Sequence, residues 1–127
     1  MNKKRLIQFR RKIYSKYKIP GMSNLHRVKQ NCVFIHTSNG IKHEQKKLEI
    51  CYELQKNGMK YITESQSCKD GRIIDVICLD TGTEVEIVDS SLTKKTKEAI
   101  AKGDIPILVI KLDDSFSLDD LLRRELE

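Results

Sequence analysis

The stretch RIIDVICLDTGTEVEIV, residues 72–88, contains two apolar segments separated by a tight turn. Residues 72–79 are an almost continuous apolar run, and residues 84–88 alternate acidic and apolar side chains. Both patterns are typical of β-strands. Because the turn at residues 80–83 is short, the two strands must form an antiparallel hairpin, and this hairpin is the centre of the predicted fold.

Three carboxylates lie on the hairpin. Asp75 stands in the middle of the apolar strand, where a charge is costly unless it is paired or coordinated. Glu84 and Glu86 are two residues apart, so they point to the same side of their strand, which Asp75 can approach in a regular hairpin. Carboxylates that converge repel one another unless a cation neutralises them, and hard oxygen ligands suit Mg²⁺ or Mn²⁺. The alternative is structural: Asp75 as an edge residue or salt-bridge partner, with the two glutamates on a solvated face.

The hairpin is preceded and followed by further regular elements. A basic helix over residues 3–18 ends at Pro20-Gly21, and residues 32–35 form a candidate short strand. A helix over 41–57, a strand over 59–63 and a polar loop over 65–71 lead into the hairpin. After it we expect a helix capped by Ser90 or Ser91 that extends to Lys102, a strand over 105–112 and an amphipathic helix over 118–126.

The order helix, strand, strand, strand, helix, strand predicts an α/β fold. The last helix and strand form a crossover, which implies a mixed sheet with parallel and antiparallel pairs. The 127 residues suit a single domain, with a basic arm over 1–38 and an α/β core over 39–127 that includes the C-terminal helix.

Composition narrows the class of protein. No apolar run approaches the roughly 20 residues that cross a bilayer, and the basic start lacks the apolar stretch of a signal peptide. We therefore expect an intracellular protein, cytoplasmic or nucleoid-associated, without a membrane partner. The four cysteines include no CxxC pair, which excludes zinc-finger spacing and favours buried thiols.

Charge is distributed unevenly along the chain. Residues 1–43 contain eleven Lys or Arg and no acid, whereas residues 44–127 contain thirteen Lys or Arg and eighteen Asp or Glu. This imbalance favours a polyanionic partner, with nucleic acid first. The expected contacts to the phosphate backbone are Lys3, Lys4, Arg5, Arg10, Arg11, Lys12 and Lys16. Aromatic residues are only 6% of the chain, so a stacking RNA-binding platform is the weaker alternative. The apolar face of residues 118–126 is a candidate surface for a homodimer.

Three short motifs resemble a known group of nucleases. Gly71-Arg-Ile-Ile-Asp75-Val resembles the R-x-D-V strand of the PD-(D/E)XK nuclease superfamily, the group with the restriction-endonuclease-like fold. His43-x-x-x-Lys47-x-x-Ile50 resembles a helix of the competence CoiA-like nucleases, and Val85-Glu86-Ile-Val88-Asp-Ser90 resembles their E-x-Q-x-S strand. The resemblance covers residues 40–112. It implies a Mg²⁺- or Mn²⁺-dependent endonuclease that hydrolyses phosphodiester bonds in DNA, and a virus or mobile element would suit so small a chain.

The resemblance also assigns roles to residues. Asp75 would be the metal-binding acid of the second core strand and Glu86 that of the third. The (D/E)-x-K motif has a lysine two residues after its acid. If Glu84 is that acid, Glu86 occupies the lysine position; if Glu86 is that acid, Val88 occupies it. In the second case Lys47 or Lys97 would supply the ammonium group, and Glu44 or Glu49 a further acid.

The first core helix would add two side chains to this site. His43 and Lys47 share one side of their helix. They would contact phosphate or assist proton transfer, unless they are simply part of a polar helix face. Without a lysine in the site, the chain would be a catalytically inactive nuclease-fold protein that binds DNA.

Overall fold

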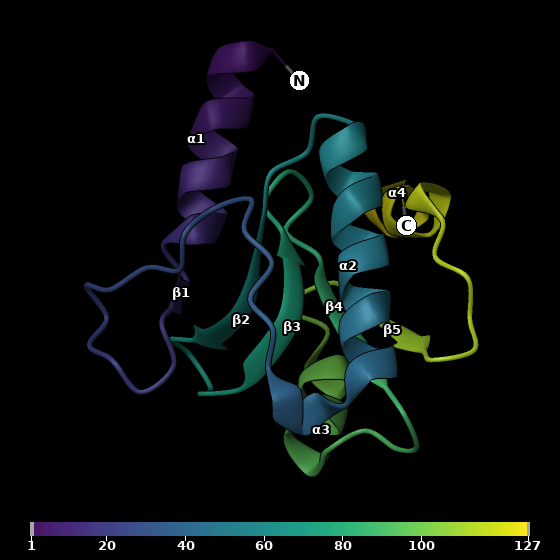
Figure 1. Ribbon diagram of the computed structural model, residues 1–127. Helices are drawn as coiled ribbons and strands as arrows, with labels where there is room; N and C mark the ends of the chain where they lie inside the picture. Colours follow the sequence, from purple (N-terminus) through teal and green to yellow (C-terminus); the bar gives the residue numbers. More distant parts are fainter. Residues whose placement is uncertain (1, 127) are drawn as a thin grey trace.

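The computed structural model describes residues 2–126, and the side chains of residues 2–122. Its centre is a five-stranded sheet in which the strands follow one another in chain order (Figure 1). The first three pairs of strands are antiparallel and the last pair is parallel. The strands are β1 (Tyr17–Lys18), β2 (Tyr61–Ser67), β3 (Ile73–Cys78), β4 (Glu84–Val88) and β5 (Ile107–Lys111). The predicted hairpin and the predicted mixed α/β sheet are thus confirmed.

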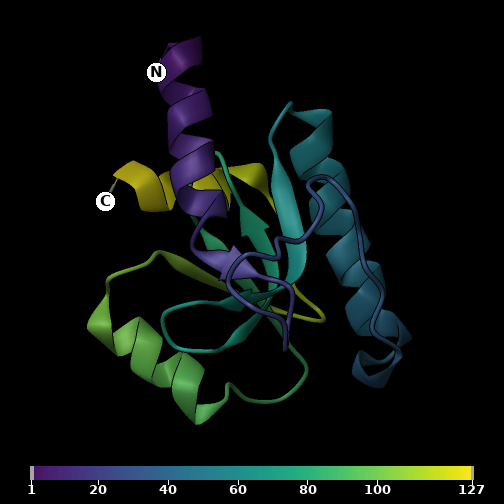
Figure 2. The same cartoon turned by 90° about the vertical axis from the view of Figure 1, so that its left-hand side faces the viewer.

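Helices cover both faces of the sheet. They are α1 (Lys3–Tyr14), α2 (Ile41–Lys56), α3 (Lys94–Lys102) and α4 (Leu118–Leu126), with a 3₁₀ turn η1 (Thr37–Asn39) before α2. Figure 2 shows α2 on one side of the sheet and α1 and α3 on the other.

A separate hydrophobic cluster lies on each face. Ile50 and Leu54 of α2 and Leu121 of α4 pack with Val76 and Val85 of the hairpin. On the opposite face, a second cluster joins Phe9 and Ile13 of α1 to side chains of β2 and β3, namely Ile62, Ile74 and Ile77. Side chains of β3 are therefore buried on both faces of the sheet, which explains the almost continuous apolar sequence of this strand.

The N-terminal half differs from the prediction in two places. The first helix ends at Tyr14, because residues 17–18 pair with the end of β2 and become a strand. The expected strand over 32–35 has no regular secondary structure. It is fastened to β2 through side chains instead, since the Phe34 N–H donates to Thr63 Oγ1 at 3.0 Å.

Two other boundaries also differ. β2 continues to Ser67, through residues predicted as a polar loop, because Ser65 and Gln66 pair with the start of β3. Helix α3 begins after Thr93, whose side chain accepts a hydrogen bond from the Thr96 N–H, and not after a serine cap at 90 or 91. Both errors concern polar residues whose conformation depends on a specific partner.

The remaining predictions concern cysteines and the membrane. All four cysteines are free thiols; Cys51 and Cys78 are buried, Cys32 is partly exposed and Cys68 is exposed. Within residues 2–126, no helix combines the length and the apolar character needed to cross a bilayer.

Candidate functional site

Strand β3 departs from regular pairing at Asp75. On one side, Thr63 pairs with Val76 and Ser65 with Ile74, which leaves Glu64 opposite Asp75 without a pairing of its own. Glu64 also has a positive φ of 48°, an uncommon conformation for a residue with a side chain and one that is associated with functional sites.

On its other side, Asp75 faces the end of β4. Val76 pairs with Val85 and Ile77 with Glu84, so the same register brings Glu86 opposite Asp75. The ladder stops there, and the Asp75 carboxylate accepts a 2.8 Å hydrogen bond from the Ile87 N–H in place of a backbone partner. Glu64, Asp75 and Glu86 therefore occupy the same level on three adjacent strands.

One oxygen of the Glu86 carboxyl group lacks a partner among the described residues. Its Oε1 atom is buried, and no hydrogen bond reaches it from the described residues. Burial raises the pKa of Glu86 to about 9, and the charges of Asp75 and Glu84 add to the increase. A buried polar atom without a partner is rare in a folded protein and calls for an explanation, such as an ion that binds there. A cation beside Glu86 would favour its ionised form.

Helix α2 adds a chain of ion pairs to the same site. His43 Nε2 lies 3.3 Å from Asp75 Oδ1, and His43 Nδ1 lies 3.0 Å from Glu44 Oε1. Lys47 Nζ lies 2.6 Å from Glu44 and 2.6 Å from Glu64 of β2. The two residues of the predicted His43/Lys47 helix face thus point into the sheet, and Glu64 joins them from a strand.

The charges of this cluster do not balance. Hydrogen bonding to Asp75 raises the pKa of His43, and both ring nitrogens face carboxylates, so the site favours the protonated ring. Burial opposes ionisation of Glu44, but hydrogen bonds from Lys47, Asn39 and His43 outweigh it and lower its pKa to about 2. With Glu86 ionised and His43 protonated, four carboxylates would face two cations, His43 and Lys47. The excess of two negative charges equals the charge of one divalent cation.

Two predicted metal ligands lie elsewhere. The Glu84 carboxylate is fully buried, where it accepts hydrogen bonds from Tyr17 Oη at 2.7 Å and from Arg72 Nη2 at 2.8 Å. Both of its oxygens are therefore occupied by protein donors. Glu49 projects from an outer part of α2, with a side chain 53% exposed and a contact to Lys46. The structure thus differs from the prediction for both residues, because Glu84 is an internal ion-pair partner and Glu49 is a surface residue.

The predicted phosphate contacts lie on α1 and just after it. Lys3, Lys4, Arg5, Arg11, Lys12 and Lys16 carry exposed or partly exposed side chains. Arg10 is engaged inside the protein, since its Nε and Nη2 atoms each lie 2.8 Å from the Asp80 carboxylate. This bidentate pair attaches α1 to the turn of the hairpin, so Arg10 differs in role from its neighbours.

Glu64 is the site residue that sequence analysis missed. It sits among polar residues that resemble the start of a loop, and nothing local places it beside Asp75. The signal appears only with the β2–β3 register, which sets two acids opposite each other at a position where like charges destabilise a sheet.

Neither comparison with known proteins nor a search for grouped metal ligands assigns a function to this site. No protein-family model, curated protein or solved structure matches this chain. Among the described residues, no group of three or more His, Cys, Asp or Glu side chains is already arranged around a single metal position. Asp75 and Glu86 stand opposite each other in the β3–β4 register, and Glu64 is paired with Lys47.

Proposed function

We propose that this protein is a divalent-metal-dependent nuclease of the PD-(D/E)XK type that acts on DNA. The observation that carries the proposal is the buried, unpartnered Oε1 of Glu86 beside Asp75. Support also comes from the order of α2, β2, β3, β4, α3 and β5, which is that of the restriction-endonuclease-like core. The exposed cations of the N-terminal helix supply a surface for the phosphate backbone.

Asp75 and Glu86 would hold the metal ion. Magnesium is commonly bound through one or two carboxylates, with waters and substrate phosphate as the remaining ligands, so two acids suffice. The bound ion would activate a water molecule and neutralise the phosphate during hydrolysis. His43 positions Asp75 through its Nε2 contact, and Lys47 fixes Glu44 and Glu64 around it.

One observation favours a second candidate, a nuclease fold that binds DNA without cleaving it. Val88 stands two residues after Glu86, where the motif has lysine. The Lys47 ammonium group has three N–H donors, and it already contacts Glu44, Glu64 and the Phe34 carbonyl. Unless substrate binding releases one of these bonds, the Lys47 ammonium group is not available to orient the attacking water.

The test combines cleavage with metal binding. Supercoiled plasmid and labelled oligonucleotides are incubated with Mg²⁺, Mn²⁺ or EDTA, using wild-type protein, Asp75→Asn, Glu86→Gln and the matched control Glu98→Gln, whose side chain is exposed on α3. Metal-dependent cleavage that survives in the control and disappears in the two site variants supports the nuclease. DNA binding without cleavage by the wild type on every substrate favours the inactive binding protein. Cleavage that persists in Asp75→Asn refutes the site.

A further inference from the structure

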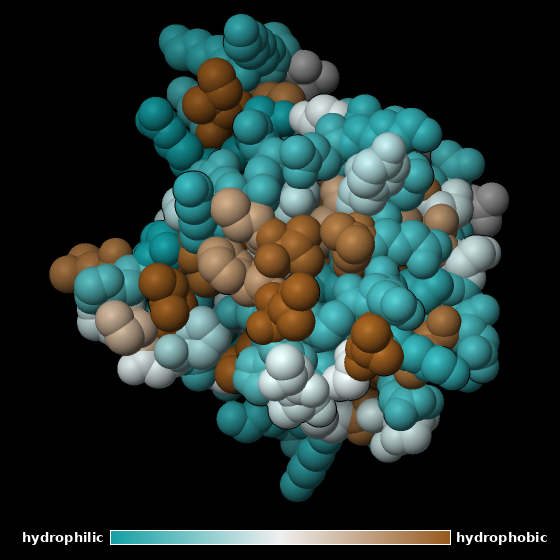
Figure 3. Space-filling view, viewed as in Figure 1, coloured by the Kyte–Doolittle hydropathy of each residue, from teal (hydrophilic) through white to brown (hydrophobic). Residues whose placement is uncertain are grey.

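A cleft opens beside Asp75 and is not explained by metal binding. It has a volume of about 690 Å³ and lies between β2–β3 and the segment that connects β1 to α2. This size falls within the roughly 300–1,000 Å³ of ordinary ligand sites. Figure 3 shows hydrophobic side chains gathered near the middle of this face of the molecule, over the segment that precedes α2.

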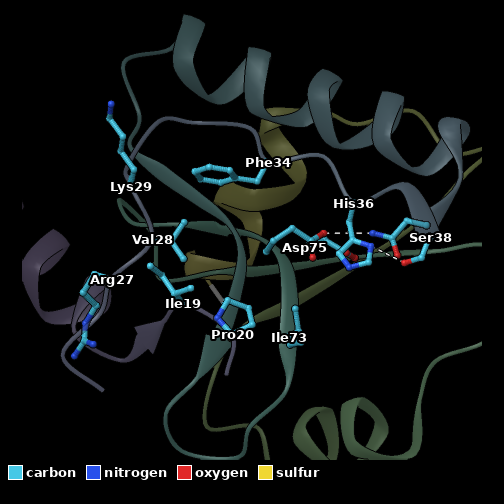
Figure 4. A pocket seen from close by; sticks show the side chains of 12 residues that line it. Ile19, Pro20, Arg27, Val28, Lys29, Phe34, His36, Ser38, Ile73 and Asp75 are labelled. Atoms are coloured by element: carbon cyan, nitrogen blue, oxygen red, sulfur yellow. Dashed lines mark hydrogen bonds between the residues drawn. The ribbon is translucent and has the colours of Figure 1, made fainter. Parts of the chain in front are cut away.

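The cleft has three chemically different parts (Figure 4). Its middle is apolar, with Ile19, Pro20, Val28, Phe34 and Ile73. Arg27 and Lys29 lie at one end, and Asp75 points toward the opposite end, where His36 and Ser38 lie. A nucleotide within a strand has the same order of groups, because an apolar base face lies between two phosphates and its edge carries hydrogen-bonding groups.

Phe34 is fixed in position although its ring is exposed. Its N–H donates to Thr63 Oγ1 at 3.0 Å, and its carbonyl accepts a 3.0 Å hydrogen bond from Lys47 Nζ. The residue nevertheless remains 45% exposed, and Ile73, two residues before Asp75 on β3, is 51% exposed. An exposed aromatic ring in an open apolar cleft, on a backbone held by hydrogen bonds, is an arrangement on which nucleic-acid bases can stack.

The cations at the rim complement a phosphate group. Hydrogen bonds from its guanidinium to the main-chain carbonyls of Ser15 and Asn24 hold Arg27 in place. None of the ion pairs between described residues joins Arg27 or Lys29 to an acid. Their charges are therefore available to an anionic ligand, as a base-stacking site requires for the adjoining backbone.

We infer that this cleft binds an unpaired nucleotide of a single-stranded segment, with the base against Phe34, one neighbouring phosphate at Arg27 and Lys29, and the other at the metal ion that Asp75 would hold. A base inside a duplex is stacked on both faces and cannot present one to Phe34, so the expected substrate is a single strand or a duplex with a single-stranded end. The inference rests on the proposed function only for the phosphate at that metal ion; the base-binding site can be tested without cleavage.

The experiment measures binding in EDTA, which removes the divalent cation and prevents the proposed cleavage. Fluorescence anisotropy compares a labelled single-stranded DNA, an RNA of the same sequence, a blunt duplex and a duplex with a single-stranded overhang. We expect the single strand and the overhang to bind about tenfold more tightly than the blunt duplex at the same salt concentration. Comparison of the RNA with the single-stranded DNA of the same sequence shows whether the protein distinguishes ribose from deoxyribose, since base stacking alone would accept both nucleic acids.

Variants locate the site. Phe34→Leu keeps an apolar side chain but removes the ring, and should weaken single-strand binding about fivefold or more, since stacking on an aromatic ring is typically worth at least that factor. Phe34→Trp should retain binding, and the control Tyr52→Leu, on the exposed side of α2, should not change it. Equal affinity for blunt duplex and single strand, or a Phe34→Leu protein that binds like the wild type, overturns the inference.

The two proposals can fail separately. Metal-dependent cleavage with no preference for single strands would refute the base-binding cleft and leave the nuclease intact. A preference for single strands that depends on Phe34, in a protein that never cleaves, would support the cleft and refute the nuclease.

Discussion

Replacing Glu84 and Glu86 separately by glutamine should have opposite consequences, although the two residues are only two positions apart. The Glu84 carboxylate is fully buried between the Tyr17 hydroxyl and the Arg72 guanidinium. In Glu84→Gln the amide can still bond to both groups, because the Tyr17 hydroxyl can accept from its NH₂, but Arg72, whose side chain is 3% exposed, loses a charged partner. Breaking a buried pair in this way costs about 3–5 kcal/mol, a large part of the roughly 5–15 kcal/mol that stabilises an ordinary domain.

Glu86→Gln should be nearly neutral for the metal-free protein. With a pKa of about 9, the Glu86 carboxyl is protonated at neutral pH and already uncharged, like an amide. The free energy of unfolding in EDTA should therefore change by less than about 1 kcal/mol. The stabilisation by metal should disappear, however, because a ligand has been lost. At free metal concentrations of 10–100 times Kd, that stabilisation is about 1.4–2.7 kcal/mol in the wild type.

Urea denaturation followed by circular dichroism, in EDTA and in Mn²⁺, separates these effects. Glu84→Gln should lower the free energy of unfolding equally in both buffers and should still gain the same stabilisation from Mn²⁺ as the wild type. Glu86→Gln should match the wild type in EDTA but gain no stabilisation from Mn²⁺. The exposed Glu98→Gln variant should match the wild type in both. If Glu84→Gln instead loses the stabilisation from Mn²⁺ while Glu86→Gln keeps it, the assignment of the two acids is reversed.

Four further variants test charged side chains, two of them on α1 and two in the site. Arg10→Gln should cost about 1–2 kcal/mol of stability through its lost Asp80 contacts, yet leave the salt dependence of DNA binding unchanged. Lys12→Gln should reduce the steepness of log K for DNA binding against log salt concentration by about 0.7–0.9, without loss of stability. Equal slopes for the two variants would contradict the assignment of Arg10 to an internal ion pair and of Lys12 to a phosphate contact. Lys47→Met should destabilise the protein by about 3–5 kcal/mol in urea, because it leaves two carboxylates facing each other; a cost below 1 kcal/mol would mean that the buried pair is not formed. The pKa of Glu44 is about 2 in the folded protein and near 4.5 in the unfolded chain, so its ionised form stabilises the fold above pH 4.5 and this stabilisation is lost as the pH falls. Between pH 5 and pH 3, the free energy of unfolding should therefore fall by about 2 kcal/mol more in the wild type than in Glu44→Gln.

The hairpin was predictable because its signals are local. A continuous apolar run, a short turn and an alternating segment determine β3 and β4 almost to the residue, and the following helix and strand imply the parallel pairing of β5. Elements rich in polar residues were harder to predict from the sequence. Residues 65–67 are a strand because β3 and β1 supply hydrogen-bonding partners on both sides, and their own side chains favour a loop.

The candidate site was predictable only in part for the same reason. Alternation places Glu84 and Glu86 on one side of β4, but it cannot show that Tyr17 and Arg72 occupy the first and leave the second unpartnered. Those donors come from β1 and from the residue that precedes β3, and Tyr17 of β1 is 67 residues away in the sequence. Which acid remains available is therefore a property of the assembled sheet.

The position of Lys47 bears on how the proposed site can work without a lysine on β4. A buried ammonium group needs compensating carboxylates wherever it originates, and here Glu44 and Glu64 supply them from α2 and β2. A lysine of the motif would lie directly beside the acid on the same strand. Lys47 instead reaches the site from α2, and all three of its N–H donors already bind acceptors within the protein. A phosphate that entered beside Asp75 would compete for the same donors, and the Phe34 carbonyl, as the one neutral acceptor, is the partner most easily given up. On the proposed assignment, substrate binding and release of that bond are coupled. Activity would then depend on Lys47 and on the backbone position of Phe34 together, and a Lys47→Arg protein, whose rigid planar group cannot make the same exchange, should bind DNA and fail to cleave it.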